Sequence, residues 1–432
     1  MNDVKQNDID MVVSTLKVFF KVSMQQKSFN FAEFLKIMES TFKAAGYRDP
    51  QGGGYGQRNI LIIQDSAVGD FILASGAVRE IRRLYPDAYI EMVIYPRSQN
   101  MAEACPYVDK VVSKERNYPN WNNPEFFYMH DVEFAKNLLK RRFDVCYSFG
   151  HYVDSTFLMY MSGAKTRITF DYSNSPREIF NCLVTHPVKI PPRHYAETRM
   201  AIIDDVLHSP VSNREIEVWL TGNDLKVAKS LINSLSRPIY ALCMGATDPK
   251  RHYPVEKYSE LVKMILSEEP TATFINFGGG QDDAFSAQIL QQRLGKEIFN
   301  RHVVNLVNKT SFRIDAAIMS FCDMYIGNNT GNMEMASAVK CPCLVMECFP
   351  KDLDSGISDV PRVYAPYKVP CVSVQPKHAL PECAVNEPYY SYGCRADRPH
   401  CITQIEPETI FKGFHLLKER IAQNLIETLY IS

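Results

Sequence analysis

The sequence carries almost no net charge and has no long uninterrupted apolar run. Its 48 lysines and arginines nearly balance its 49 aspartates and glutamates, which leaves a formal net charge of -1 and gives no electrostatic sign of a nucleic-acid partner. Charged residues break the longest apolar runs within about ten residues, too short a stretch to cross a bilayer. No cationic leader with an apolar core precedes the first motif, so we expect a cytoplasmic protein without a transmembrane segment.

The chain does have the length and apolar content of a large globular protein. With 432 residues, 46% of them hydrophobic, it is long enough for two or three domains. Its 12 cysteines would fit a disulfide framework, but the length and the lack of a leader favour reduced thiols or a metal site.

Apolar spacing divides the chain into four parts. Residues 1–56 show helical spacing followed by the glycine-rich joint QGGGYGQ, which predicts a helical appendage. Residues 57–215 and 216–412 each alternate short apolar strands with helices, the pattern of βαβ units. The sequence therefore predicts an α/β fold with two Rossmann-like domains. Residues 413–432 read as a last helix, which we expect to pack back on the first domain.

The most informative motif is RNILIIQDSAVGD, residues 58–70. Its apolar run, residues 60–63, predicts a strand buried on both faces, followed by a small-residue turn and a helix that Asp70 opens. A ligand at the carboxyl end of such a strand meets free backbone N–H groups and one carboxylate together. Asp70 on local sequence alone is equally well explained as a helix N-cap.

Three further motifs follow strands of the second half: ALCMGATDPKRHY (residues 241–253), FINFGGG (residues 274–280) and YIGNNTGNMEMASAVKCP (residues 325–342). The last of them lies between a strand and a helix, so its backbone can offer N–H groups to a phosphate. Each motif taken alone also fits an ordinary loop or turn. The candidate donor-binding residues are Gly69 in the first motif and, in these three motifs, Thr247, Lys250, Gly278, Gly279, Asn329, Thr330 and Gly331.

Taken in order, the motifs resemble those of the family-9 glycosyltransferases, the heptosyltransferase group, over roughly residues 57 to 412. The S-x-x-G-D turn of that family is present as SAVGD, its AL-x-x-LRR-x-x-P helix is similar to GAVREIRRLYPD, and its G-A-x-x-x-x-K segment is similar to GATDPK. The resemblance implies a GT-B fold, in which two Rossmann-like domains face a cleft. It also implies an inverting enzyme that moves heptose from ADP-heptose to a hydroxyl of a protein or of a lipopolysaccharide-core saccharide.

The resemblance implies a role for each motif. Asp70, after Gly69, would be the base that takes the acceptor proton. Thr247 and Lys250 would hold the donor diphosphate, since fixed cations and backbone dipoles can stabilise the leaving group without a divalent metal. We therefore expect no catalytic Mg²⁺. The glycine run that includes Gly278 and Gly279 would lie near the nucleotide, as in the family.

The third motif departs from the family pattern G-N-D-S/T-G-x-x-H. Asn329 replaces the aspartate that reaches sugar hydroxyls, and Glu334 replaces the histidine. Asn329 still donates and accepts hydrogen bonds, but the change leaves the sugar open. The alternatives are a transferase for another nucleotide sugar and a catalytically silent nucleotide-sugar-binding or scaffold protein. The retained Asp70 and Lys250 argue against a silent protein.

Four late cysteines lie in a stretch that is poor in periodic structure and rich in Pro, Gly and Tyr. Four thiolates would order such a loop by tetrahedral coordination of zinc or iron, with free thiols or disulfides as the alternatives. The stretch resembles the cysteine-rich finger of autotransporter-type, protein-modifying heptosyltransferases, in which four cysteines hold an iron, and this favours a protein acceptor. The residues concerned are Cys371, Cys383, Cys394 and Cys401, with His378 and His400 as spare ligands.

Other polar residues of the first domain are expected to be structural or to face the acceptor. The segment HYAETRM resembles a loosely kept H-x-x-x-x-R stretch, and we assign its members His194, Glu197 and Arg199 no catalytic role. Arg97 and His151 follow strands of the first domain, where an acceptor is expected to bind. The oligomeric state is left open, including a homo-oligomer.

Overall fold

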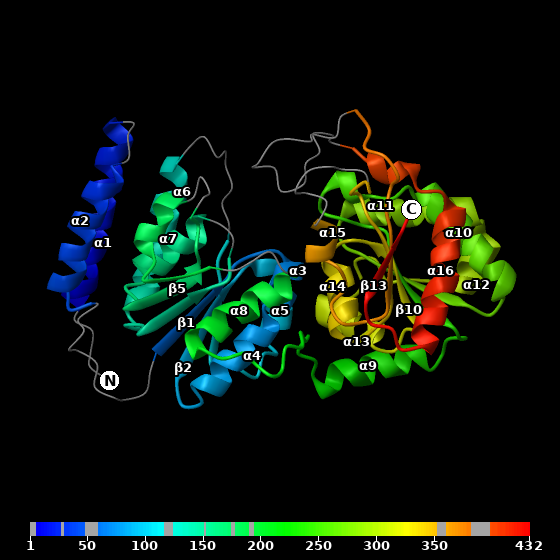
Figure 1. The fold of residues 1–432 in the computed structure, drawn as a ribbon, viewed down its shortest axis with the longest axis horizontal. Helices are drawn as coiled ribbons and strands as arrows, with labels where there is room; N and C mark the ends of the chain where they lie inside the picture. The colour runs from blue at the N-terminus through cyan, green and yellow to red at the C-terminus, as the bar shows by residue number, and fades with distance from the viewer. Residues whose placement is uncertain are drawn as a thin grey trace. The chain divides into compact units, whose positions relative to one another are not determined.

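The computed structural model describes residues 6–26, 30–47, 59–115, 124–150, 153–173, 178–189, 194–351, 360–381 and 398–432. The chain forms two compact units, shown as ribbons in Figure 1. Unit 1 comprises Met1–Pro191 and Glu197–Arg214, and unit 2 comprises Pro192–Ala196 and Glu215–Ser432. We describe each unit by itself.

Unit 1 is built on a six-stranded parallel sheet with the order β3-β2-β1-β4-β5-β6. Its strands are β1 (Asn59–Gln64), β2 (Tyr89–Ile94), β3 (Lys110–Ser113), β4 (Val145–Ser148), β5 (Thr166–Phe170) and β6 (His186–Val188). The strand order reverses between β1 and β4. In open parallel sheets, ligands bind beyond the carboxyl ends of the strands at such a switch point.

Helices cover both faces of this sheet, which is why β1 is buried along nearly its whole length. Figure 1 shows α6 and α7 on one face and α4, α5 and α8 on the other. The helical segments are α3 (Val68–Leu73), α4 (Ser75–Leu84), α5 (Gln99–Ala102), α6 (Pro124–Leu139), α7 (Val153–Met161) and α8 (Tyr195–Leu207), with the 3-10 helices η1 (Pro96–Ser98) and η2 (Glu178–Leu183).

The N-terminal segment is helical, as the sequence predicts, with α1 (Gln6–Gln26) and α2 (Phe31–Ala44). Asn30 caps α2 by accepting the N–H of Glu33 at 3.1 Å, and α1 packs on α6. The ring of Phe42 packs edge-on against Tyr160 of α7, with centroids 5.8 Å apart. The appended helices therefore extend the core of unit 1, because their apolar faces are buried against its other helices.

Unit 2 repeats the plan with a seven-stranded parallel sheet of order β13-β12-β11-β10-β7-β8-β9. The strands are β7 (Ile239–Cys243), β8 (Thr273–Phe277), β9 (Val303–Asn305), β10 (Met324–Asn328), β11 (Cys343–Met346), β12 (Cys371–Val374) and β13 (Thr428–Ile431). Here the order reverses between β7 and β10, which gives unit 2 its own switch point.

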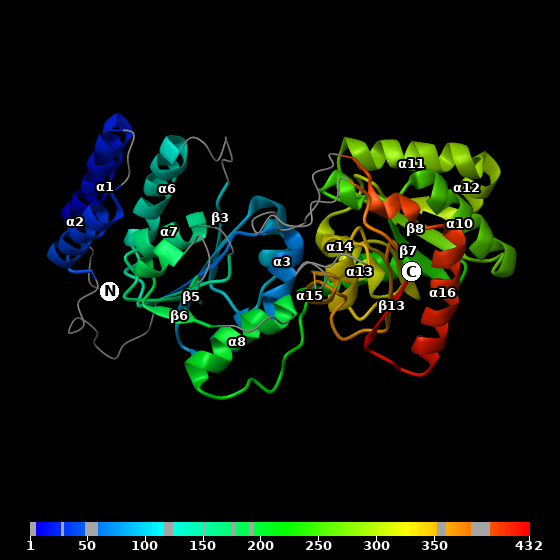
Figure 2. The same cartoon turned by 45° about the horizontal axis from the view of Figure 1, so that its top comes forward.

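The helical segments of unit 2 again lie on both faces of the sheet, as Figure 2 shows for α13 and α14 opposite α16. They are α9 (Gly222–Ile232), η3 (Pro249–Arg251), α10 (Val255–Glu268), α11 (Gln281–Leu294), α12 (Lys296–His302), α13 (Phe312–Met319), α14 (Gly331–Ala338), α15 (Val360–Val363), η4 (Cys401–Gln404) and α16 (Pro407–Ala422).

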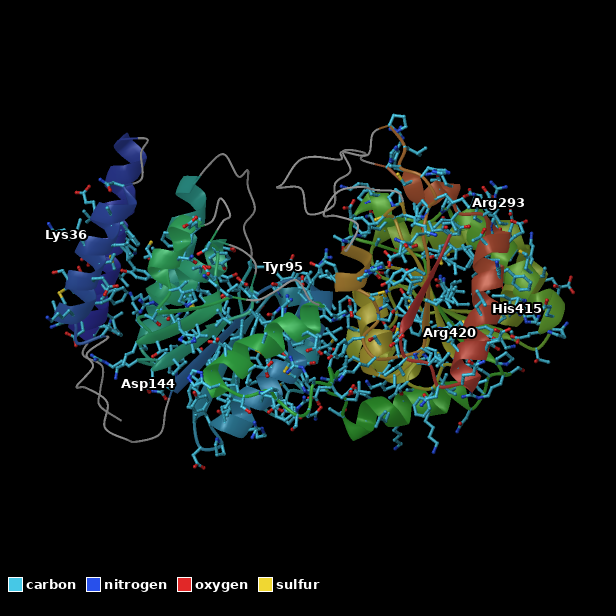
Figure 3. All side chains as sticks on the ribbon, viewed as in Figure 1. Lys36, Tyr95, Asp144, Arg293, His415 and Arg420 are labelled. Atoms are coloured by element: carbon cyan, nitrogen blue, oxygen red, sulfur yellow. The ribbon has the colours of Figure 1, made fainter. Side chains whose placement is uncertain are left out.

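The end of the chain is not a single helix. We expected one helix over residues 413–432, but α16 ends at Ala422 and a strand follows it. Within unit 2, α16 packs on β11, β12 and α10, and its packing on the first domain stays a prediction. Phe414 of α16 is buried within unit 2 and lies 5.5 Å, centroid to centroid, from the ring of Tyr240. The chain then adds the edge strand β13. His415 and Arg420, labelled in Figure 3, both lie on α16.

None of the helices among the described residues is long and apolar enough to cross a membrane.

Candidate functional site

Asp70 lies at the switch point of unit 1. The turn after β1 leads into α3, whose N-cap is Ala67, and no side chain caps this helix. Asp70 is therefore the third residue of the helix and not its N-cap, so the capping explanation of this residue is wrong. Its carboxylate stands in the first helical turn, where the helix dipole favours a negative charge.

A buried arginine holds this carboxylate. Nη2 of Arg199, on α8, donates to Oδ1 of Asp70 at 3.2 Å. The Arg199 side chain is fully buried, whereas the Asp70 side chain is 18% exposed. A buried guanidinium requires a charged or polar partner, so the pair fixes the direction in which Asp70 points. From the sequence we gave Arg199 no role at the site, and the structure places it in contact with the candidate base.

A second acid nearby is excluded from solvent. Asp65 is fully buried, and its Oδ1 accepts a hydrogen bond from Oγ of Ser155 at 2.6 Å. A Cβ added to Gly150, after β4, would lie 2.8 Å from the same Oδ1, so the chain closes tightly over this acid. Asp70, and not Asp65, is thus the carboxylate that a substrate can reach.

The switch point of unit 2 carries Lys250 in η3, just after β7. Asp248 caps this short helix by accepting the N–H of Lys250 at 3.2 Å. The ammonium of Lys250 lies 3.5 Å from the other carboxylate oxygen of Asp248, and Thr247 next to it is exposed. A phosphate bound here would share Lys250 with Asp248, and it would gain a charge-assisted hydrogen bond.

The glycine run after β8 packs against the carboxylate of Asp283, a residue of the first turn of α11. The N–H of Gly279 donates to Oδ2 of Asp283 at 2.7 Å, and a Cβ on Gly278 would lie 2.6 Å from that oxygen. Gly245 after β7 faces the same carboxylate. Burial raises the pKa of Asp283. These glycines make room for an acid that we did not single out from the sequence, although an acid in a first helical turn after a glycine run is a recognisable signal.

The third motif forms the turn between β10 and α14. Thr330 is the N-cap of α14 and its side chain makes no capping bond. Backbone N–H groups at the N-terminus of a helix are able to bind an anion. Asn328 is fully buried and ties the turn to the neighbouring strand, since its Nδ2 donates to the carbonyl oxygen of Met244 at 2.6 Å. Gly331 opens the helix beside Thr330.

Asn329 does not stand alone in this turn. Its Nδ2 donates to both carboxylate oxygens of Glu347, at 2.9 and 3.1 Å. Nη1 of Arg251, from η3, donates to the backbone oxygen of Asn329 at 3.1 Å. Glu347 follows β11 and is fully buried, and burial raises its pKa to about 7. We did not single out Glu347 from the sequence, although an acid directly after a buried strand was a signal of the same kind as Asp70.

Polar side chains thus gather at both switch points, and comparisons with known proteins identify the family. The sequence model of glycosyltransferase family 9 (heptosyltransferase) matches residues 132–346. Lipooligosaccharide heptosyltransferase 2 of Haemophilus ducreyi is 22% identical over 294 residues, which make up 66% of this chain and 80% of that protein. The chain belongs to glycosyltransferase family 9.

Solved structures agree with this family-9 assignment at the level of the fold. A family-9 glycosyl transferase from Veillonella parvula matches with a TM-score of 0.66 and 16% identity, covering 84% of this chain and 98% of that one. The E. coli ADP-heptose lps heptosyltransferase II matches with a TM-score of 0.59 and 16% identity, covering 84% and 99%. The expected fold class, GT-B with two Rossmann-like sheets, is confirmed.

Two of the remaining polar candidates of this family-9 glycosyltransferase, His194 and Glu197, have structural partners. Nε2 of His194 donates to the backbone oxygen of Ala365 at 2.7 Å. Glu197 accepts from Nε of Arg214 at 2.6 Å. Arg97 is exposed on η1, and His151 lies outside the described residues.

The late cysteines are only partly described, since Cys383 and Cys394 lie outside the described residues. Sγ of Cys401, on η4, is buried and lies 3.3 Å from Nδ1 of His400. Cys371 is fully buried in β12, where it pairs in register with Cys343 and Thr428. In the part of the chain that the structure describes, no group of three or more His, Cys, Asp or Glu side chains could hold a metal.

Cys371 and Cys401 have different surroundings. Val372 of β12 packs in the same core as Ile402, the neighbour of Cys401. Side chains alternate along a strand, so Cys371 faces the opposite side of the sheet from Val372. The structure therefore does not bring Cys371 to Cys401, and Cys371 does not fit as a fourth ligand beside it.

Proposed function

We propose that this family-9 glycosyltransferase moves heptose from ADP-heptose to an acceptor hydroxyl with inversion at the anomeric carbon. The observation that carries the proposal is the Asp70–Arg199 pair, a partly exposed carboxylate held by a buried cation at the end of β1. The named activities of the Haemophilus ducreyi and E. coli relatives support heptose and ADP as the parts of the donor.

Each unit supplies one part of this chemistry. The acceptor oxygen forms a bond to the anomeric carbon while the bond from that carbon to the diphosphate oxygen breaks, and ADP leaves with the bonding electrons. The hydroxyl proton goes to a carboxylate oxygen of Asp70. Lys250, Thr247 and the N-terminus of α14 stabilise the charge that develops on the diphosphate. No divalent metal has a step in this scheme.

We propose a sugar hydroxyl of a lipopolysaccharide core as the acceptor, since the relatives named above are lipopolysaccharide or lipooligosaccharide heptosyltransferases. A protein hydroxyl is the second candidate, favoured by the resemblance of the late cysteines to the finger of protein-modifying heptosyltransferases. A structural zinc or iron belongs to that second candidate. Cys401 and His400, buried side by side, fit such a metal, and Cys371 does not.

The test is release of ADP from ADP-heptose by the full chain, with a heptose-deficient lipopolysaccharide core or an autotransporter protein as acceptor. The proposal expects release that depends on ADP-heptose and on one of the two acceptors. Mass spectrometry of the acceptor identifies which one gains a heptose. Equal release of UDP from UDP-sugars or of GDP from GDP-sugars, or binding of ADP-heptose without any transfer, would overturn it.

A further inference from the structure

The donor turn of unit 2 presents a neutral amide backed by a buried acid. Asn329 and Glu347 follow the neighbouring strands β10 and β11, which pair in parallel register from Tyr325 to Asn328. Both side chains are buried, Glu347 completely and Asn329 to all but 7%. Burying a carboxyl group costs free energy unless its oxygens are hydrogen-bonded. The hydrogen-bond partners of Glu347 therefore indicate its structural role.

The hydrogen bonds leave only one orientation for the amide. Above its raised pKa of about 7 Glu347 is ionised, and an ionised carboxylate accepts hydrogen bonds and donates none. The group that faces it at 2.9 and 3.1 Å is then Nδ2 of Asn329. The same nitrogen also lies 3.5 Å from the carbonyl oxygen of Tyr364. Among the described residues no donor is bonded to Oδ1 of Asn329. That oxygen therefore faces away from Glu347 as a hydrogen-bond acceptor.

We propose that Glu347 is a positioning residue that makes Asn329 present only an acceptor oxygen to a hydroxyl group of the donor sugar. This inference rests on the proposed function, because it takes the bound ligand to be a nucleotide sugar. With this arrangement, the site offers a hydrogen-bond acceptor oxygen, as a carboxylate would, but without a negative charge.

The surroundings of Glu347 support a fixed role. Oγ of Ser373, from β12, donates to Oε1 of Glu347 at 3.3 Å. Arg251 links η3, the helix that carries Lys250, to the backbone oxygen of Asn329. The acid is thus anchored from the strand behind it, and the amide is anchored to the loop that is proposed to hold phosphate.

The test exchanges the two groups and measures binding of ADP-heptose and of ADP by calorimetry at pH 8. N329D places two carboxylates face to face, so we expect affinity for ADP-heptose to fall by about tenfold or more, because like charges in contact disfavour the bound geometry. The double variant N329D/E347Q exchanges the two groups. The amide introduced by E347Q can donate a hydrogen bond to the carboxylate introduced by N329D, which again presents an acceptor oxygen. We expect the double variant to recover to within about threefold of the wild type.

ADP alone is the internal reference, because it has no sugar hydroxyl to donate to Asn329. We expect its affinity to change less than about threefold in N329D and in the double variant. Equal affinity of N329D and the wild type for ADP-heptose, or a double variant no better than N329D, would overturn the inference. A wild type that binds neither ADP nor ADP-heptose would instead overturn the proposed function. Thermal melting of each variant separates these results from misfolding.

Discussion

The two sheets of this protein place their proposed functional groups at the same topological position, but the outer group is charged in unit 1 and neutral at Asn329 in unit 2. At the switch point of unit 1, a partly exposed carboxylate, Asp70, is paired with a fully buried arginine, Arg199. At that of unit 2, the amide of Asn329 is the outer group and the carboxyl of Glu347 lies fully buried behind it. A base needs an ionised and reachable oxygen, whereas a site for a departing diphosphate needs cations and neutral donors or acceptors.

The largest expected effect comes from removing Asp70, the proposed base of unit 1. Asp70→Asn keeps the shape of the side chain but cannot accept a proton, so turnover should fall by about 10²-fold or more. Steady-state release of ADP in the presence of acceptor measures this. Asp87→Asn, the same exchange at an exposed position of unit 1, is the control and should stay near the wild-type rate. Full activity in the Asp70→Asn enzyme would leave Asp70 without a catalytic role.

Next in size is the loss of the cation of unit 2. Lys250→Ala removes a charge-assisted hydrogen bond to the diphosphate, which is worth about 1.5 to 3 kcal/mol. The Michaelis constant for ADP-heptose should rise by roughly 10- to 150-fold. Because fixed groups replace a metal in the scheme, wild-type turnover should survive a chelator that strips Mg²⁺. Turnover that stops with the chelator and returns with Mg²⁺ would contradict the metal-free scheme.

Arg199 should show a smaller effect with a distinct signature. Arg199→Lys keeps the charge but not the planar guanidinium, so we expect a moderate loss of turnover, about tenfold. Arg199→Gln removes the cation that favours ionised Asp70, so the acid limb of the pH–rate profile should move to higher pH. The Lys variant should leave that limb near its wild-type position. An acid limb that is unchanged in both variants would assign Arg199 to packing alone.

The sequence predicts the residues that directly follow strands and misses most of their partners. Asp70, Lys250 and Asn329 could be found because a buried strand, a small-residue turn and a helix are written consecutively in the chain. Arg199 is 129 residues from Asp70, and its contact depends on how α8 packs on α3. Glu347 meets Asn329 because β10 and β11 are neighbours in the sheet, an order that periodicity does not encode.

The same limit applies to the helices at the two ends of the chain. The apolar faces of α1 and α16 could be predicted from their spacing, but not the surfaces that they cover. A helix with an apolar stripe packs on whichever exposed apolar surface the topology brings to it. Here α1 packs on α6, and α16 packs on β11 and β12.

Glu347 should make the stability of the folded protein depend on pH. Its pKa is raised by burial from an ordinary value of 4.5 to about 7, against the opposing effect of Asn329, Arg251 and Ser373. The folded state then keeps a proton that the unfolded state loses, so the contribution of Glu347 is largest below pH 4.5 and declines as pH rises to about 7. Relative to Glu347→Gln, the wild type should therefore lose melting temperature from pH 5 to pH 8. A constant difference between the two proteins would contradict the raised pKa.

The smallest expected effect on catalysis concerns the late cysteines. If Cys383, Cys394 and Cys401 hold a structural zinc or iron, elemental analysis should find about one metal per chain. Cys401→Ser should lower metal content and melting temperature. Cys371→Ser is the control, since its thiol lies in β12 beside Thr428, and it should leave metal content unchanged. A metal-free wild type of equal stability, or loss of metal in the Cys371 variant, would contradict this assignment.

The division of labour between the two switch points is tested most directly by titrating ADP into three proteins: the wild type, Asp70→Asn and Lys250→Ala. If unit 1 supplies the base and unit 2 holds the leaving group, the Asp70 variant should bind ADP as tightly as the wild type. The Lys250 variant should bind it roughly 10- to 150-fold more weakly. ADP affinity that falls in the Asp70 variant and is unchanged in the Lys250 variant would contradict the account.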